Sequence, residues 1–127
     1  MVDDHPAVRC GLAQLMSEEE DLTVCGEAGS AEEALTAIPV SRPDIVLADV
    51  SLGGMDGFAL TRALQAIVPD VPVLMISIHD EDVYAAQALR AGARGYLTKA
   101  QMPETMLTAI RKVLSGENFF NDSLAMT

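Results

Sequence analysis

Apolar residues along the chain follow two spacings that alternate with each other. Five segments place apolar residues three or four positions apart, which predicts amphipathic helices. We expect these helices at Pro6–Ser17, from Ser30 to the prolines Pro39 and Pro43, around Leu60–Ile67, at Glu81–Ala91 and from about Pro103 to Leu114. Short, mostly apolar runs lie between them and predict strands at Leu22–Cys25, Ile45–Ala48, Val73–Ile76 and Tyr96–Thr98.

Local signals define several helix ends and inward faces. Ser30 and Glu33 have the spacing of a capping box, Pro39 with Pro43 is expected to close that helix, and Gly92 is placed to end another. The apolar residues expected to face inward are Val8, Leu12, Leu15 and Met16, then Ala31, Ala34, Leu35 and Ile38, then Leu60, Leu64 and Ile67, then Ala85, Ala88 and Leu89, and finally Met106, Ile110, Val113 and Leu114.

Strands separated by helices favour parallel crossovers, which predicts an open α/β sheet with helices on both faces. A first strand ought to precede Asp3, yet only Met1 and Val2 stand there, too few residues to cross a sheet. Either the native chain begins before Met1 or the sheet is damaged at that strand, and we expect the former. Residues 118–127 are polar and weakly patterned, so we expect one domain over residues 1–117 followed by a tail or the start of a linker.

Composition narrows the class of protein. Half of the 127 residues are hydrophobic and 21% are charged, which excludes a disordered chain, and no run approaches the length of a membrane span. The net charge of −11 argues against nucleic-acid binding by this chain itself. Cys10 and Cys25 lack the further ligands of a zinc site and are expected to be reduced side chains of a cytoplasmic protein.

Chemically useful side chains gather at the expected carboxyl ends of the strands, where open α/β sheets bind ligands. Asp3 and Asp4 follow the first-strand stub, and Asp49, Ser77 and Lys99 end later strands. Converging carboxylates must be neutralised by protons or a cation, and hard oxygen ligands without nearby sulfur or imidazole favour Mg²⁺. With Lys99 and Ser77 holding phosphoryl oxygens, Asp49 would be a carboxylate nucleophile toward phosphorus.

Four motifs follow one another along almost all of the chain. They are Val2-Asp3-Asp4-His5-Pro6, Asp49-Val50-Ser51-Leu52-Gly53-Gly54-Met55-Asp56-Gly57, Val73-Leu74-Met75-Ile76-Ser77-Ile78-His79-Asp80 and Gly95-Tyr96-Leu97-Thr98-Lys99-Ala100. Together they resemble the receiver domain of two-component response regulators. The His-Pro after the acidic pair and the Gly-Tyr-Leu-Thr-Lys-Ala run are most similar to the NarL/FixJ subfamily. The resemblance implies a flavodoxin-like fold, with five parallel strands in the order 2-1-3-4-5 and five helices.

The resemblance also implies a role for each matching residue. Asp49 matches the aspartate that a histidine kinase phosphorylates, and Lys99 the lysine that binds the phosphoryl group. Asp4 matches a direct Mg²⁺ ligand, Asp3 one that acts through water, and Ser51 a ligand through its backbone carbonyl. The switch pair of the family, a hydroxyl and an aromatic residue, corresponds to Ser77 and Tyr96. Gly53 departs from the family pattern, which usually has proline there.

The same resemblance implies partners. We expect a sensor histidine kinase as phosphoryl donor, a possible homodimer, and contact with DNA only through a LuxR-type helix-turn-helix domain after Thr127. The domain is expected to catalyse its own phosphorylation and slow dephosphorylation without being an enzyme that turns over a separate substrate.

Two other functions stay open, together with plainer interpretations of single residues. A phosphatase of the haloacid-dehalogenase type also forms an aspartyl phosphate, but it needs a second aspartate where this chain has Ser51. A pseudo-receiver would be an interaction module that is never phosphorylated. Asp3 and Asp4 also suit a helix N-terminus, and Tyr96 suits ordinary core packing.

Overall fold

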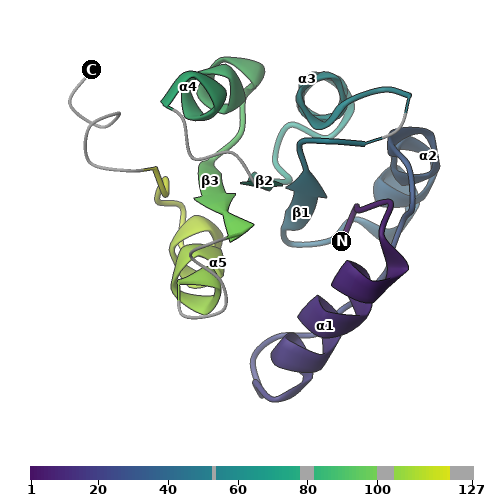
Figure 1. Ribbon diagram of the computed structural model, residues 1–127, viewed down its shortest axis with the longest axis vertical. Helices are drawn as coiled ribbons and strands as arrows, with labels where there is room; N and C mark the ends of the chain where they lie inside the picture. The colour runs from purple at the N-terminus through teal and green to yellow at the C-terminus, as the bar shows by residue number, and fades with distance from the viewer. Residues whose placement is uncertain (53, 78–81, 100–104, 121–127) are drawn as a thin grey trace.

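A computed structural model describes residues 1–52, 54–77, 82–99 and 105–120 of the chain. Helices and strands alternate along most of it, as the two apolar spacings predict (Figure 1). Gly53, Glu81 and Pro103 lie outside the described residues, so the expectations that involve them are not addressed. The elements are α1 (Pro6–Ser17), α2 (Ala31–Ser41), β1 (Val46–Asp49), α3 (Gly57–Ile67), β2 (Val73–Ser77), α4 (Asp82–Ala91), β3 (Gly95–Thr98) and α5 (Met106–Leu114).

The strands form a parallel sheet in the order β1-β2-β3. The described residues therefore contain three strands where the sequence predicts five. On the far side of β1, Val2 makes single parallel bridges to Ala48 and to Ala28, and these bridges take the places of the two missing strands. Ala28 stands in the place of the predicted second strand and Val2 in the place of the first, each as a single residue. Followed by β1, β2 and β3, they give the predicted spatial order 2-1-3-4-5.

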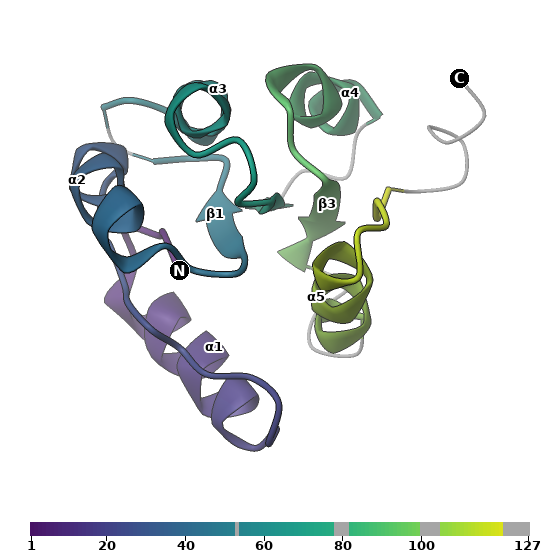
Figure 2. The ribbon, with the colours of Figure 1, turned by 180° about the vertical axis from the view of Figure 1, so that it is seen from behind.

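Helices cover both faces of this sheet (Figures 1 and 2). Alternate strand residues divide between two apolar clusters because successive side chains of a strand point to opposite faces. One cluster joins the strands to α2, α3 and α4, and the other joins them to α1 and α5. This is the doubly wound arrangement that the sequence predicts.

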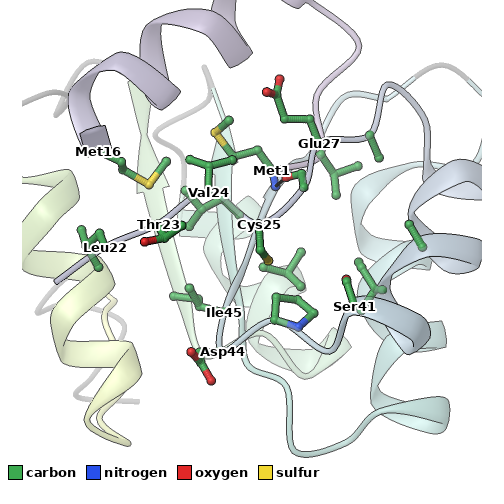
Figure 3. Close-up of a pocket in the computed structure, with 18 of the residues that line it drawn as sticks. Met1, Met16, Leu22, Thr23, Val24, Cys25, Glu27, Ser41, Asp44 and Ile45 are labelled. Atoms are coloured by element: carbon green, nitrogen blue, oxygen red, sulfur yellow. Dashed lines mark hydrogen bonds between the residues drawn. The ribbon is translucent and has the colours of Figure 1, made fainter. Parts of the chain in front are cut away.

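The segment Leu22–Cys25 is not a strand, which corrects the sequence prediction. A cavity of about 470 Å³ separates it from the segment that leads into β1, and Met1 lies at the edge of this cavity (Figure 3). Leu22 and Val24 line one side and Ile45 the other. A strand needs hydrogen-bonded neighbours along its length. The backbone hydrogen bonds from Met1 and Asp3 go to Gly26 and Ala28, which follow this segment in the chain.

Four predictions about the helices also need correction. Pro39 lies inside α2 and does not end it. The helix continues to Ser41 and ends where Arg42 adopts a left-handed conformation with φ of 46°, directly before Pro43, so only the second of the two prolines lies at the helix end. Three other residues were expected to face inward but are exposed, namely Ile67, Leu89 and Leu114. Residues near them in the chain are buried instead, namely Val68, Ala91 and Val113, because each step along a helix turns the side chain by about 100°.

Residues beyond α5 add to the opposite edge of the sheet. Phe119 makes a parallel bridge to Gly95 and exchanges backbone hydrogen bonds with Arg94 and Tyr96. In the described part of the chain, no helix has the length and hydropathy of a membrane-spanning segment.

The start of α3 is packed directly against the end of β1. A Cβ atom added to Gly57 would lie 2.2 Å from the backbone oxygen of Asp49 and 2.9 Å from the Cα of Val50, so glycine is required at this contact. Gly11 in α1 is exposed and has no heavy atom within 4 Å of such a Cβ.

We predict that the same substitution has opposite effects at these two glycines. Gly57→Ala should lower the free energy of unfolding by about 2–3 kcal/mol because the strand end must move. Gly11→Ala should raise it by about 0.5–1 kcal/mol because alanine favours the helix. Urea denaturation of the two variants measures both values, and an equal effect at the two positions would contradict this packing.

Candidate functional site

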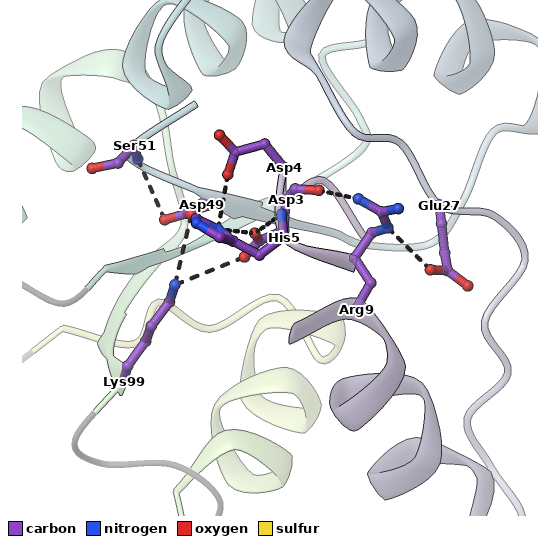
Figure 4. Close-up of polar contacts among 8 residues, drawn as sticks. All are labelled: Asp3, Asp4, His5, Arg9, Glu27, Asp49, Ser51 and Lys99. Atoms are coloured by element: carbon purple, nitrogen blue, oxygen red, sulfur yellow. Dashed lines mark hydrogen bonds and ion pairs between the residues drawn. The ribbon is translucent and has the colours of Figure 1, made fainter. Parts of the chain in front are cut away.

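The site lies where the carboxyl ends of β1 and β3 meet residues 1–4, the N-terminal stub (Figure 4). Asp49 is the last residue of β1. The backbone of Val2 accepts a hydrogen bond from the Asp49 N–H at 2.9 Å and donates one to Leu47 at 2.8 Å. These bonds fix the register of the stub, so that Asp3 is placed next to Asp49.

Two buried carboxylates face one ammonium group at this edge. Asp3 and Asp49 are each 4% exposed. Lys99, which directly follows β3, places its Nζ atom 3.7 Å from the Oδ2 of Asp49 and 3.8 Å from the Oδ2 of Asp3. Both separations exceed a close hydrogen bond, so the Lys99 ammonium interacts with both carboxylates through its charge.

Asp4 is more exposed than Asp3 and lies on the solvent side of the cluster. Asp3, Asp4, His5 and Asp49 each offer a ligand atom, and these atoms lie within 4.8 Å of one another. The sequence argument for Mg²⁺ assumed that no imidazole lies nearby, and that assumption is wrong. The Nδ1 atom of His5 is 3.0 Å from the Oδ1 of Asp3 and 2.9 Å from the Oδ1 of Asp4.

The other predicted site residues lie around this cluster. The backbone N–H of Ser51 donates to the Oδ1 of Asp49 at 3.3 Å. Ser77 is the buried last residue of β2, beside Thr98 in the parallel register. Tyr96 is buried on β3 and belongs to the apolar cluster shared with α2, α3 and α4.

Arg9 also supports the site, and sequence reasoning missed it. Its guanidinium donates to the backbone oxygen of Asp3 and, at 3.2 Å, to the Oε1 of Glu27 (Figure 4). A hydrogen bond to a backbone carbonyl leaves no pattern in the sequence. The position of Arg9 in the first turn of α1 could still have suggested that its side chain reaches back to the residues before the helix. The side chain ties α1 to the stub that carries the two aspartates.

The surroundings of Asp49 disfavour its ionised form. Burial raises the pKa of Asp49 above its ordinary value, and the neighbouring Asp3 carboxylate raises it further. The Lys99 ammonium and the Ser51 N–H oppose this shift of the pKa but do not cancel it. Burial and the neighbouring carboxylate thus together outweigh the stabilisation that Lys99 and the Ser51 N–H give to the ionised form.

This donor set fits a divalent cation. Three carboxylates converge here, and Lys99 is the lysine that lies beside two of them. Hard oxygen donors of this kind are the preferred ligands of Mg²⁺. A cation held by Asp3, Asp4 and Asp49 would offset the repulsion between their carboxylates.

Comparison with known proteins gives one consistent family. Residues 1–111 match the response regulator receiver domain. The chain is 36% identical over 125 residues to the response regulator GacA of Pseudomonas aeruginosa and 42% identical over 125 residues to the transcriptional activator protein ExaE of Pseudomonas putida. In both cases the alignment covers 98% of this chain and 58% of the relative, so the chain spans little more than half of their length.

A solved structure agrees with these relatives. A two-component response regulator of the LuxR family from Aurantimonas sp. SI85-9A1 superposes with a TM-score of 0.92 at 34% identity. The superposition covers 98% of this chain and 89% of that one.

We predict that Asp49→Asn stabilises the protein in EDTA at neutral pH. Because the pKa of Asp49 is raised in the folded state, folding binds a proton between the ordinary and the raised pKa. Wild-type stability therefore falls as pH rises through that window, and the penalty persists above it. The variant should show a higher Tm at pH 7 and a flatter Tm profile across the window.

Asp44→Asn provides the control, because Asp44 is an exposed aspartate outside the cluster. Thermal unfolding followed by circular dichroism between pH 4 and pH 8 measures all three proteins. An Asp49→Asn protein that melts below the wild type at pH 7 would contradict the account of a penalised buried charge.

Proposed function

The chain belongs to the response regulator receiver domain family, and we propose that it is a phosphorylation-dependent switch in which Asp49 accepts a phosphoryl group from a histidine kinase. The observation that supports this proposal most directly is the buried Asp49 carboxylate, 3.7 Å from the Lys99 ammonium at the carboxyl edge of a parallel sheet. The relatives agree with this proposal, since GacA is a response regulator and the signal receiver domain of NarL from Mycobacterium tuberculosis is 34% identical to this chain.

The proposed reaction is an in-line displacement at phosphorus. An Oδ atom of Asp49 forms a bond to the phosphorus while the bond from phosphorus to the donor nitrogen breaks, and the electron pair leaves with the imidazole. The Lys99 ammonium holds one phosphoryl oxygen, and the Ser77 hydroxyl donates to another. Later attack of water on the acyl phosphate returns the free carboxylate, which makes the switch reversible.

We assign Asp3, Asp4, Asp49 and the Ser51 backbone carbonyl to the Mg²⁺ site of this reaction. When bound, Mg²⁺ would screen the repulsion between the carboxylates and the incoming phosphoryl oxygens. Burial raises the pKa of Asp49 and the Asp3 carboxylate raises it further, so a bound cation would favour the ionised nucleophile.

Ser77 and Tyr96 are the proposed switch residues. Ser77 ends β2, and Tyr96 lies on β3 three residues before Lys99. A hydroxyl that moves toward a phosphoryl group on Asp49 would leave space beside β3, and a change in the packing of Tyr96 would carry the signal to α4, β3 and α5.

The wider context is proposed from relatives. The length that the relatives have beyond this alignment supports an output domain after Thr127, which we propose to be a LuxR-type helix-turn-helix. The net charge of −11 agrees that DNA contact would belong to that domain. Homodimer formation and a cytoplasmic location also remain predictions.

Two alternatives make different predictions. A haloacid-dehalogenase type phosphatase would turn over small phosphate esters, although Ser51 stands where it needs an acid. A pseudo-receiver would neither bind Mg²⁺ nor become phosphorylated, and the convergence of Asp3, Asp4 and Asp49 beside Lys99 argues against it.

We predict that acetyl phosphate with Mg²⁺ adds one phosphoryl group to the chain, as measured by intact-protein mass spectrometry. Asp49→Asn should abolish the mass increase, and EDTA should suppress it in the wild type. Lys99→Ala should slow the reaction roughly 10²-fold, because it removes the one side-chain cation that faces Asp49 in the described structure.

Asp44→Asn is the matched control and should react at the wild-type rate. Phosphorylation that persists in Asp49→Asn would contradict the assignment of the acceptor. Rapid hydrolysis of a phosphate ester by the wild type would favour the phosphatase, and failure to bind Mg²⁺ in a calorimetric titration would favour the pseudo-receiver.

A further inference from the structure

The chain beyond α5 returns to the sheet and binds the side of β3 that faces away from β2 (Figures 1 and 2). The N–H of Phe119 donates to the backbone oxygen of Arg94 at 2.9 Å, and the backbone oxygen of Phe119 accepts from the N–H of Tyr96 at 2.9 Å. These two bonds flank Gly95, to which Phe119 makes a parallel bridge. Phe119 therefore occupies the position of a further strand at this edge of the sheet.

The rings of Phe119 and Phe120 hold this contact from both faces of the sheet. Phe119 packs against the apolar cluster that joins the strands to α1 and α5, and the Lys112 ammonium lies 5.9 Å from its ring centre. Phe120 packs against the other cluster, which contains Tyr96 and buried residues of α4. Because successive side chains go to opposite faces, as in a strand, both layers of helices hold the segment.

Gly95 permits the close approach of this segment to β3. A Cβ atom at Gly95 would lie 3.0 Å from the backbone oxygen of Phe119, 3.3 Å from the Cβ of Phe119 and 2.7 Å from the Cδ1 of Leu74. These separations are shorter than the optimal distance between non-bonded atoms, so a side chain here would push against the segment. The fit between Phe119 and β3 thus depends on the backbone itself.

Tyr96 connects this segment to the proposed phosphorylation site. Its N–H binds Phe119, its side chain shares an apolar cluster with Phe120, and Lys99 follows three residues later in the chain. The proposed function gives Tyr96 a change of packing when Ser77 moves toward a phosphoryl group. That change would remove part of the surface against which Phe120 packs.

We propose that Phe119 and Phe120 form a latch on the edge of β3, which is closed in the unphosphorylated chain and is loosened when Asp49 is phosphorylated. This inference rests on the proposed function and adds the element that reads the state of the site. Because the latch precedes the proposed output domain in the chain, its loosening would change how closely that domain is tethered to the sheet.

Hydrogen exchange of single backbone amides, measured by NMR, tests the latch with beryllium fluoride and Mg²⁺ as the mimic of a phosphoryl group. Exchange of the Tyr96 and Phe119 amides should accelerate roughly tenfold or more, because their hydrogen bonds join the latch to β3. The Arg94 amide is the matched control, since it donates to Val73 at 2.9 Å, and its exchange should change less than about twofold. Asp49→Asn should show no acceleration at these amides.

A second measurement uses the reciprocity of coupling, by which a weaker latch must favour binding of the mimic. Phe120→Ala should lower the Kd for beryllium fluoride about threefold or more. Val40→Ala is the matched variant, because Val40 is an exposed apolar residue of α2, and it should keep the wild-type Kd. A folded Phe120→Ala protein with an unchanged or higher Kd would contradict the latch.

Mass spectrometry after treatment with acetyl phosphate and Mg²⁺ separates the two proposals. A protein that gains the phosphoryl group, but whose Tyr96 and Phe119 amides exchange at unchanged or slower rates with the mimic bound, would overturn the latch alone. A protein that gains no phosphoryl group would refute the proposed function and the latch together.

Discussion

The pairing of two buried carboxylates with one ammonium is the interaction on which the site depends. Asp3 and Asp49 are almost inaccessible to solvent, and Lys99 lies at nearly equal distances from both. Burial raises the pKa of Asp49, and the neighbouring Asp3 carboxylate raises it further against the opposing charge of Lys99. A divalent cation bound here would lower the repulsion between these carboxylates and an incoming phosphoryl group.

The fold keeps this unfavourable arrangement in place through backbone contacts that do not depend on the charges. Val2 is hydrogen-bonded to β1 on one side and makes a bridge to Ala28 on the other. Gly57 at the start of α3 packs closely against the backbone of Asp49 and so holds the end of β1 in place. Arg9 ties the stub to α1. The energy that holds the carboxylates together therefore comes from hydrogen bonds and packing in the surrounding α/β layers.

Much of the fold and the site could be predicted from the sequence because the signals are local. Continuous apolar runs identified β1 and β2, and the Ser30 capping box identified the start of α2, where the hydroxyl of Ser30 accepts from the N–H of Glu33. Features that depend on distant partners could not be predicted in this way. Leu22–Cys25 has the composition of a strand but lacks a strand to pair with, and the rotation of His5 toward Asp4 leaves no trace in residue order.

The central claim is that Asp49, a divalent cation and Lys99 together bind a phosphoryl group. A crystal structure of the protein with beryllium fluoride and Mg²⁺ tests it most directly, since beryllium fluoride mimics a phosphoryl group on a carboxylate. The account predicts beryllium bonded to an Oδ atom of Asp49, the cation between Asp49 and the Asp3-Asp4 pair, and one fluoride within reach of the Lys99 Nζ atom. Crystals in which Asp49 stays unmodified while the cation and beryllium fluoride bind elsewhere would contradict it.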